Sequence, residues 1–237
     1  MKILADYHTH TKFSHGKGTI EENVLVARKK GIVKIGISDH GYKHLTYGIK
    51  LTDLQKMRDE VNRLNEKYND IEVLLGMECN ALDDKGNIDT NDEVLKLCDY
   101  IMVGYHFGST PLSFDGILNH ANNYFKNSKR TIDYNTNAII NAMKNNDIFI
   151  VTHPGDKGEV YIQEIAKVAK NTNTMLEINS SHCFLNVEQL KKIKDIENDL
   201  VIGSDAHKPI DVGNFELAMK TIKESGIDVN LIKNIKL

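Results

Sequence analysis

Three histidines close to the start of the chain are the first residues that could do chemistry. In the stretch ADYHTHTKFSHGKGT, residues 5–19, His8, His10 and His15 fall within eight positions, and the whole chain has only ten histidines. Imidazoles are bulky, partly polar and able to charge near neutral pH, so such a group needs a purpose. Neutral imidazole is a common metal ligand, and the stretch therefore raises the question of whether further ligands follow.

Polar residues recur along the chain at the ends of short apolar runs. Each run is rich in β-branched residues and ends in His, Asp, Glu or Asn. The strands that these runs predict span residues 2–8, 33–40, 72–79, 100–107, 148–155, 174–180 and 200–207. The residues of interest at or just beyond their ends are His8, His10, His15, Asp39, His40, Glu78, His106, His153, Asp205 and His207.

Longer amphipathic patterns separate the strands and predict helices. They span residues 19–31, 51–68, 91–99, 134–146, 160–172, 187–198 and 214–225. Thr19 and Glu22 form a capping box for the first of these helices, and Gly31 follows its end. A repeated strand-then-helix order implies parallel strands joined by right-handed crossovers.

The position of the polar residues decides between an open sheet and a barrel. In an open sheet the outer strand ends lie too far apart to share a site, whereas in a barrel all of them meet at one rim. We therefore predict an α/β fold in which a single domain, residues 1–237, forms a closed or nearly closed (β/α)7 barrel resembling a TIM barrel.

A shared role in metal binding explains the polar residues of this rim better than a separate role for each residue does. A single strand-end histidine is more often a hydrogen-bonding loop residue than a ligand, and Asp39 beside His40 would fit a helix cap. Independent accidents would not place a polar residue at every strand end, however, and imidazoles with carboxylates are suited to divalent metal ions. The sequence therefore predicts a metal centre.

Other polar residues have less decisive positions. His44 and His120 fall outside the strand-end pattern, and we predict them on the surface. His182 follows the sixth strand and either faces the site or packs in a loop. Glu177 and Asn179 share one face of that strand, where a hydrogen bond inside the barrel and a catalytic role are both open.

Composition restricts the remaining classes. With 41% hydrophobic and 27% charged residues and a net charge of −3, the chain reads as a globular protein without a nucleic-acid groove. The three cysteines are scattered, which argues against a disulfide framework. The sequence has no membrane-length apolar run and no leader pattern at its start. We therefore expect a cytoplasmic location and neither membrane nor nucleic acid as a partner.

The motifs resemble those of the PHP (polymerase and histidinol phosphatase) family of metal-dependent phosphoesterases. Over nearly the full chain they read, in order, DYHTHT, SH, ISDHG, GMECN, GYH, THPG and GSDAH. Within the family the likeness is to the small stand-alone phosphatases of the YcdX-like branch, which implies a distorted (β/α)7 barrel with a trinuclear metal site. The spacing before His15 is one residue shorter than in that branch.

The resemblance also implies how the ligands are shared among three divalent ions, for which zinc, manganese and iron are all suitable. One ion would be held by His8, His10, Glu78 and Asp205; Glu78 would bridge to a second ion held by His106 and His153; His15, His40 and His207 would hold the third. Asp39 is predicted to orient a neighbouring ligand imidazole.

Such a centre is suited to hydrolysing a phosphate ester. Metals roughly 3.5–4 Å apart lower the pKa of a bridging water, and the resulting hydroxide would attack phosphorus. A small phosphorylated substrate is expected to contact Lys157, Lys208, His182 or Arg130. The chain has only four arginines, which argues mildly against a bidentate phosphate clamp.

Several alternatives use the same residues. A histidinol-phosphate phosphatase is the second candidate within the family. A nuclease-type enzyme, a metallohydrolase acting on C–N bonds and a non-catalytic metal-binding protein are the candidates from other classes.

Overall fold

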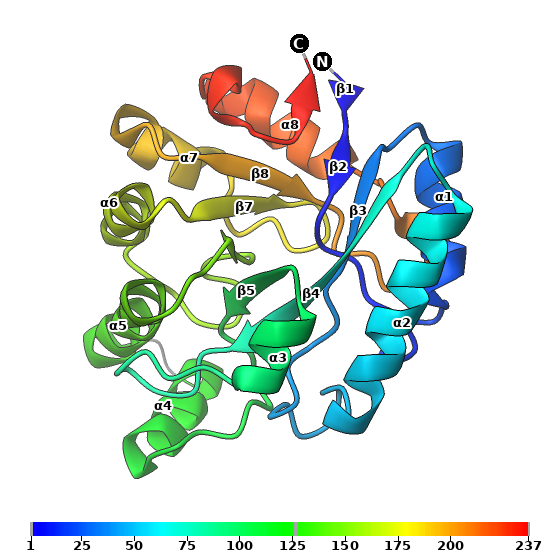
Figure 1. Ribbon diagram of the computed structural model, residues 1–237. Helices are drawn as coiled ribbons and strands as arrows, with labels where there is room; N and C mark the ends of the chain where they lie inside the picture. Colours follow the sequence, from blue (N-terminus) through cyan, green and yellow to red (C-terminus); the bar gives the residue numbers. More distant parts are fainter. Residues whose placement is uncertain (1, 126–127, 237) are drawn as a thin grey trace.

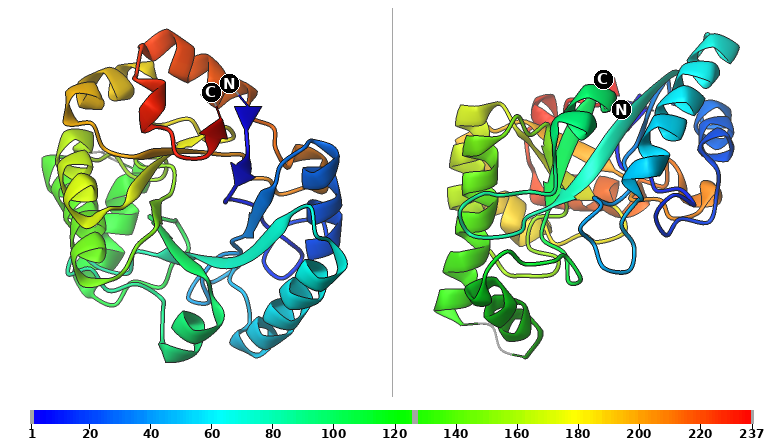
Figure 2. Two further views of the ribbon diagram at one scale, coloured as in Figure 1. Left: turned by 45° about the horizontal axis from the view of Figure 1, so that its top comes forward. Right: turned by 60° about the horizontal axis from the view of Figure 1, so that its bottom comes forward.

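A parallel sheet of seven strands, in the order β2-β3-β4-β5-β6-β7-β8, forms the centre of the computed structural model. The structure describes residues 2–125 and 128–236. In Figures 1 and 2 the sheet curves into a barrel and the helices pack around its outside. The strands are β2 (Ala5–Asp6), β3 (Lys34–Ile37), β4 (Glu72–Asn80), β5 (Tyr100–Gly104), β6 (Ile150–Val151), β7 (Met175–Asn179) and β8 (Leu200–Gly203).

The helices form the outer layer between successive strands (Figure 2, left). They are α1 (Ile20–Lys29), α2 (Leu51–Lys67), α3 (Asp92–Leu97), α4 (Phe114–Phe125), α5 (Lys129–Asn145), α6 (Ile162–Thr172), α7 (Val187–Ile193) and α8 (Glu216–Ser225). Three short 3₁₀ helices, η1 (Lys194–Ile196), η2 (Pro209–Asp211) and η3 (Val229–Leu231), lie in the last third of the chain. No helix in the described ranges is both long and apolar enough to cross a membrane.

The barrel prediction is confirmed, and its closure is incomplete. Strands β2 and β8 are the two ends of the sheet and do not pair as strands. A single parallel bridge between Thr9 and Ala206 joins them beyond their ends. The buried Asp6 carboxylate adds two contacts, accepting hydrogen bonds from the backbone N–H of Ser204 at 3.1 Å and of Gly213 at 2.9 Å. The Asp6 side chain of β2 thus links this strand to the segment that follows β8.

Replacing Asp6 with alanine should therefore destabilise the barrel. The change removes the acceptor of three backbone N–H groups, those of His8, Ser204 and Gly213, and we expect the free energy of unfolding to fall by roughly 2–4 kcal/mol. Urea denaturation would measure it. Asp70→Ala is the matched control, because Asp70 pairs with Arg28 on the surface with 54% of its side chain exposed, and such pairs contribute about 0–1 kcal/mol. Equal effects of the two substitutions would show that Asp6 does not hold the barrel closed.

The first predicted strand and one helix differ from the sequence expectation. The first run is divided into β2 and a preceding β1 (Lys2–Ile3), which pairs antiparallel with β9 (Ile235–Lys236). Helix α4 was not predicted. Its inner face is polar, since Asn119 Nδ2 donates to Asn135 Oδ1 at 2.8 Å, while Phe114 at its start is 72% exposed. Helix α4 therefore carries polar side chains on its inner face and apolar side chains on its outer face, the reverse of the usual amphipathic pattern.

An apolar cluster within the sheet complements the polar rim. Tyr100 Oη donates a hydrogen bond to the backbone oxygen of Tyr7 at 2.7 Å. The buried members of the cluster are Tyr100, Met102, Ile150, Met175 and Val201. Because they come from the amino-terminal or middle parts of their strands, the carboxyl ends are left for polar groups.

Candidate metal centre

The histidines and carboxylates that were predicted at strand ends lie together at the carboxyl end of the barrel. They end or follow β2, β3, β4, β5, β6 and β8. Four overlapping sets of three residues offer ligand atoms that lie within 4.8 Å of one another. The members of these sets are His8, His10, His40, Glu78, His106, His153, Asp205 and His207.

Glu78 lies at the centre of the cluster, and its side chain is fully buried. Its Oε1 lies 2.9 Å from His153 Nε2, 3.1 Å from His106 Nε2 and 3.4 Å from His8 Nε2. Its Oε2 lies 2.8 Å from His40 Nδ1. Burial raises the pKa of this carboxyl, but His106, His8 and His40 together hold the pKa well below its usual value. An ionised carboxylate whose two oxygens face different imidazoles is suited to bridging two cations.

His8, His10 and Asp205 form a tight triangle beside Glu78. The Nε2 atoms of the two histidines are 3.1 Å apart, and Asp205 Oδ1 lies 3.2 Å from His10 Nε2 and 3.5 Å from His8 Nε2. Burial raises the pKa of the Asp205 carboxyl, but the neighbouring histidines hold the pKa well below its usual value. Three ligand atoms converging from two strand ends suit one cation.

A third group consists of stacked imidazoles. The ring of His10 lies 4.4 Å from that of His207 and 4.5 Å from that of His40, between ring centroids. His15 lies beside this group, 4.1 Å from His207 and 4.8 Å from His40. The resemblance implied a set of His15, His40 and His207, whereas in the described residues His10 takes the place of His15. His15 instead stacks on Tyr47 at 4.3 Å.

The backbone is unusual at two of these residues. His153 has a φ of 25° and Asp205 a φ of 53°, both in the left-handed region that non-glycine residues rarely adopt. Such conformations persist where surrounding structure enforces them, and they concentrate at functional sites. Gly104 is also constrained, in its case by close packing, because a Cβ there would lie 2.8 Å from His106 Cε1. The chain is therefore shaped to bring these side chains inward.

Orphaned polar atoms indicate that cations fit this cluster. Within the described part of the chain, four buried atoms here have no hydrogen-bond partner, namely His10 Nδ1, His15 Nδ1, His40 Nδ1 and Glu78 Oε2. The short His40–Glu78 approach lacks the geometry of a hydrogen bond. Leaving a buried polar atom unpaired costs about 1–3 kcal/mol, so the cluster needs partners that the protein does not supply. Imidazole nitrogens and carboxylate oxygens are the donor set of zinc, iron and manganese.

The protonation of the imidazoles also suits metal binding, which requires neutral histidine. Burial, reinforced by neighbouring imidazoles, lowers the pKa of His15 to about 3 and holds that of His10 well below the usual value. His153 and His8 differ, because burial acts to lower both pKa values but nearby carboxylates raise that of His153 to about 9 and that of His8 well above its usual value. A metal ion must displace a proton at His153, so we expect metal affinity to increase with pH.

Glu177 and Asn179 support the cluster from β7. Glu177 Oε1 lies 2.7 Å from His8 Nδ1, and Oε2 accepts from the backbone N–H of His153 at 2.9 Å. Asn179 Nδ2 donates to Glu177 Oε2 at 2.9 Å and to Asp205 Oδ2 at 3.2 Å. Of the two roles left open by the sequence, the hydrogen-bonding one matches these contacts. A carboxylate on Nδ1 turns Nε2 of His8 toward the cluster.

Asp39 was predicted to orient a neighbouring imidazole, but its hydrogen bonds among the described residues go to hydroxyl and amide donors. Its carboxylate accepts hydrogen bonds from the backbone N–H of Thr11 at 2.7 Å, from Thr11 Oγ1 at 2.6 Å and from Ser14 Oγ. These partners belong to the loop that carries His15. Asp39 therefore shapes that loop instead, because its neighbours in space are hydroxyl and amide donors.

A cavity of about 210 Å³ opens onto the cluster. Of the candidate substrate contacts, Lys157 and His182 line it. Arg130 and Lys208 are not among the described residues that line it. Arg130 is at the start of α5, where its guanidinium pairs with Asp115 of α4 at 3.1 Å on the outer surface. The structure thus brings two of the four candidates to the site.

The surface prediction is wrong for His44 and holds only in part for His120. His44 is only 7% exposed and lines the cavity, and its Nδ1 accepts the backbone N–H of Tyr47 at 3.1 Å. His120 is partly buried and hydrogen-bonds to Tyr105 Oη and to the backbone oxygen of Ser109. Neither follows a strand directly, so the strand-end pattern gave no sign of their burial.

Three further residues line the cavity without having been singled out from the sequence: Tyr47, Phe107 and Asp156. Asp156 comes three residues after His153 in the same loop, and Phe107 follows His106 directly. That adjacency was the available signal. Tyr47 carried none, because only the folded loop stacks it on His15.

Comparisons with known proteins identify relatives that match nearly the whole chain. A probable phosphatase of Thermoanaerobacter sp. (strain X514) is 35% identical over 252 residues, covering 99% of this chain and 91% of that protein. A probable phosphatase of Shewanella sediminis is 30% identical over 240 residues, covering 95% and 87%.

The fold is also shared with a solved structure. Histidinol phosphate phosphatase from Lactococcus lactis subsp. lactis Il1403, in complex with zinc, L-histidinol and phosphate, superposes with a TM-score of 0.63 at 15% identity. The superposition covers 95% of this chain and 94% of that one. The PHP domain family matches residues 6–181, which is most of the chain. The chain therefore belongs to the PHP domain family.

Proposed function

We propose that this protein is a metal-dependent phosphoesterase that hydrolyses small phosphomonoesters. One observation carries the proposal: the Glu78 carboxylate lies within 2.8–3.4 Å of four imidazoles that follow four different strands. This donor set belongs to a centre of more than one cation. Membership of the PHP family and the names of relatives, which are probable phosphatases, support the reaction class.

The proposed ligands are the nine residues predicted from the sequence: His8, His10, His15, His40, Glu78, His106, His153, Asp205 and His207. We propose up to three divalent ions of zinc, manganese or iron. His15 is the ligand with the weakest geometric support, since it approaches the others through ring contacts only. Glu177, which hydrogen-bonds to His8, is a positioning residue.

Divalent ions held by these residues would supply Lewis acidity, making hydroxide from water near neutral pH and offsetting the charge of the phosphoryl oxygens. The protein supplies the positioning. Lys157 carries its ammonium at the cavity wall, where it is suited to an anionic ester oxygen. His182 is 40% exposed, and its Nε2 lies 3.8 Å from Asp205 Oδ2. It faces the same cavity and can donate a hydrogen bond to the substrate.

Hydrolysis of a substrate panel tests the reaction class. The protein loaded with manganese or zinc is expected to release phosphate from 4-nitrophenyl phosphate, to lose that activity with a chelator and to regain it with metal. Bis(4-nitrophenyl) phosphate, single-stranded DNA and an amide substrate represent the nuclease-type and C–N alternatives. Histidinol phosphate represents the second candidate within the family. Preferential cleavage of the diester, the DNA or the amide would contradict the proposal.

A further inference from the structure

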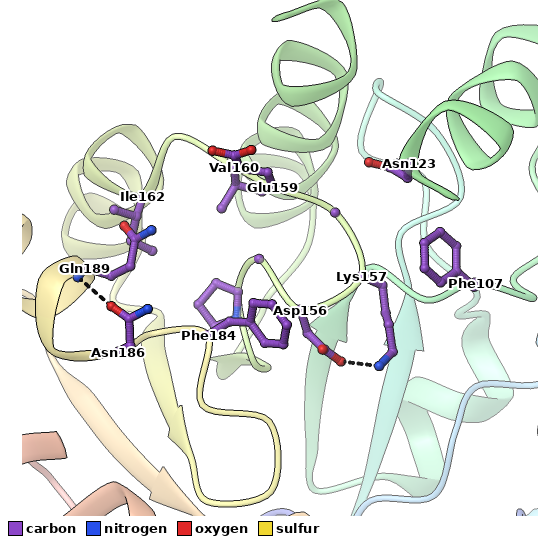
Figure 3. Close-up of a pocket in the computed structure, with 13 residues that line it drawn as sticks. Phe107, Asn123, Asp156, Lys157, Glu159, Val160, Ile162, Phe184, Asn186 and Gln189 are labelled. Carbon is purple, nitrogen blue, oxygen red and sulfur yellow. Dashed lines mark hydrogen bonds and ion pairs between the residues drawn. The ribbon is translucent and has the colours of Figure 1, made fainter. Parts of the chain in front are cut away.

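A second cavity lies against the metal centre, on the side of the loop that follows β6. It has a volume of about 360 Å³, larger than the 210 Å³ of the cavity over the cluster. Phe107, Asp156 and Lys157 line both cavities, so the two adjoin along these side chains. Figure 3 shows Lys157 and Asp156 between the ring of Phe107 and that of Phe184. A molecule held at the metal centre can extend into this second space.

The shared wall is built around an ion pair. Lys157 Nζ lies 2.8 Å from Asp156 Oδ2, and the Asp156 side chain is only 3% exposed. Asp156 Oδ1 lies 3.8 Å from His182 Nδ1, on the side of the metal centre. The buried carboxylate therefore fixes the lysine at the boundary between the two cavities, where the ester oxygen of a bound substrate would lie.

The rest of the second cavity is suited to a neutral group. Phe184 and Val160 supply apolar surface, while Gln189 and Asn186 supply amide groups from the start of α7 (Figure 3). Asn186 Oδ1 already accepts the backbone N–H of Gln189, which caps the helix. Apolar surface beside amides fits a ring with hydroxyl groups, since the ring face packs and the hydroxyls hydrogen-bond.

Charge also favours a neutral occupant. Lys157 and Asp156 both line the cavity and pair with each other, so their charges offset and the shared wall offers no net charge to the alcohol half. The size is also sufficient, because a volume of about 360 Å³ exceeds what a single sugar ring needs.

We propose that this second cavity binds the alcohol half of the substrate, and that this half is a neutral, hydroxyl-bearing ring of the size of a monosaccharide. The inference rests on the proposed phosphomonoesterase function. In that reaction water adds to phosphorus while the bond from phosphorus to the ester oxygen breaks. One proton of the water ends on the released alcohol, and the other atoms leave as hydrogen phosphate. The alcohol is thus formed in the second cavity.

Filling the cavity tests this assignment. Gln189→Trp is expected to lower kcat/KM for glucose 6-phosphate by about tenfold or more, while hydrolysis of methyl phosphate, which needs no second cavity, changes by less than about twofold. Glu188→Trp is the matched control, because Glu188 is the preceding residue of α7, is 76% exposed and does not line the cavity. It should alter neither substrate.

Two further measurements keep the test decisive. Gln189→Ala, which removes the amide without adding bulk, should raise KM for glucose 6-phosphate several-fold and leave methyl phosphate unchanged, even if the tryptophan variant folds poorly. The wild-type protein should prefer glucose 6-phosphate to glucosamine 6-phosphate, which has the same ring with an ammonium group.

The outcomes separate the inference from the function on which it rests. If the metal-loaded wild type hydrolyses methyl phosphate but the Gln189 variants affect both esters equally, the assignment of the second cavity is wrong and the phosphomonoesterase function stands. A preference for glucosamine 6-phosphate would also overturn the neutral assignment. If the wild type hydrolyses none of the phosphomonoesters, the proposed function is wrong and the assignment of the cavity falls with it.

Discussion

Replacing Glu78 with glutamine is expected to lower kcat/KM for phosphomonoester hydrolysis by about 10²–10³-fold or more, since loss of one preorganised electrostatic group already has an effect of this size. Glutamine keeps the shape of the side chain but removes its negative charge and puts an NH₂ group in place of one carboxylate oxygen. Both oxygens of Glu78 face imidazoles, at 2.9 Å for His153 and 2.8 Å for His40. No orientation of an amide offers two acceptor atoms to them.

The expected result has a second readout besides activity. Metal content of the Glu78→Gln variant should fall by more than one ion per chain, because Glu78 belongs to two of the sets of ligand atoms, one with His8 and His153 and one with His40 and His106. Glu72→Gln is the matched control, as Glu72 starts the same strand, is 52% exposed and pairs with Lys34 on the surface. Wild-type metal content in the Glu78 variant would show that this carboxylate does not bridge ions.

Replacing Glu177 with glutamine should lower both metal affinity and kcat/KM by about 10–100-fold, the usual effect of removing the partner of a ligand histidine. The carboxylate accepts from His8 Nδ1 at 2.7 Å and from the backbone N–H of His153 at 2.9 Å. An amide can satisfy one of these donors but presents its own N–H groups to the other. The imidazole of His8 then loses the hydrogen bond that directs Nε2 toward Glu78.

Metal competition distinguishes positioning from simple destabilisation. The Glu177→Gln variant should release its metal at a lower concentration of a competing chelator, and excess metal should restore much of the lost activity. The thermal midpoint measured without metal controls for folding. A variant with unchanged metal affinity but reduced activity would contradict the positioning role and would place Glu177 in contact with the reaction itself.

The barrel could be predicted from the sequence because a polar residue falls at or just beyond the end of every predicted strand. Parallel strands must carry their side chains to one end, so residues as distant as His8 and His207 could be placed together before the fold was known. The strand-end pattern included Glu78 together with Asp39 and Asp205, and the resemblance to the PHP family implied that Glu78 bridges two ions. Glu78 lies at the centre of the cluster.

Features that depend on three-dimensional packing could not be predicted in this way. Helix α4 turns asparagines inward and phenylalanine outward, opposite to the pattern on which helix prediction relies. His44 is buried through a loop that folds back over the rim, and Asp39 is adjacent to His40 in sequence yet bonds to Thr11 and Ser14. His10, rather than His15, forms a set of possible ligand atoms with His40 and His207. This grouping depends on the positions of the rings in space, which the spacing of residues in the sequence does not determine.

Anomalous diffraction from crystals grown with manganese or zinc tests the central claim most directly, because one map gives both the number of ions and their ligands. We expect three anomalous peaks at the carboxyl end of the barrel, with two of them bonded to Glu78. A single peak, or peaks that leave Glu78 without a metal, would contradict that claim.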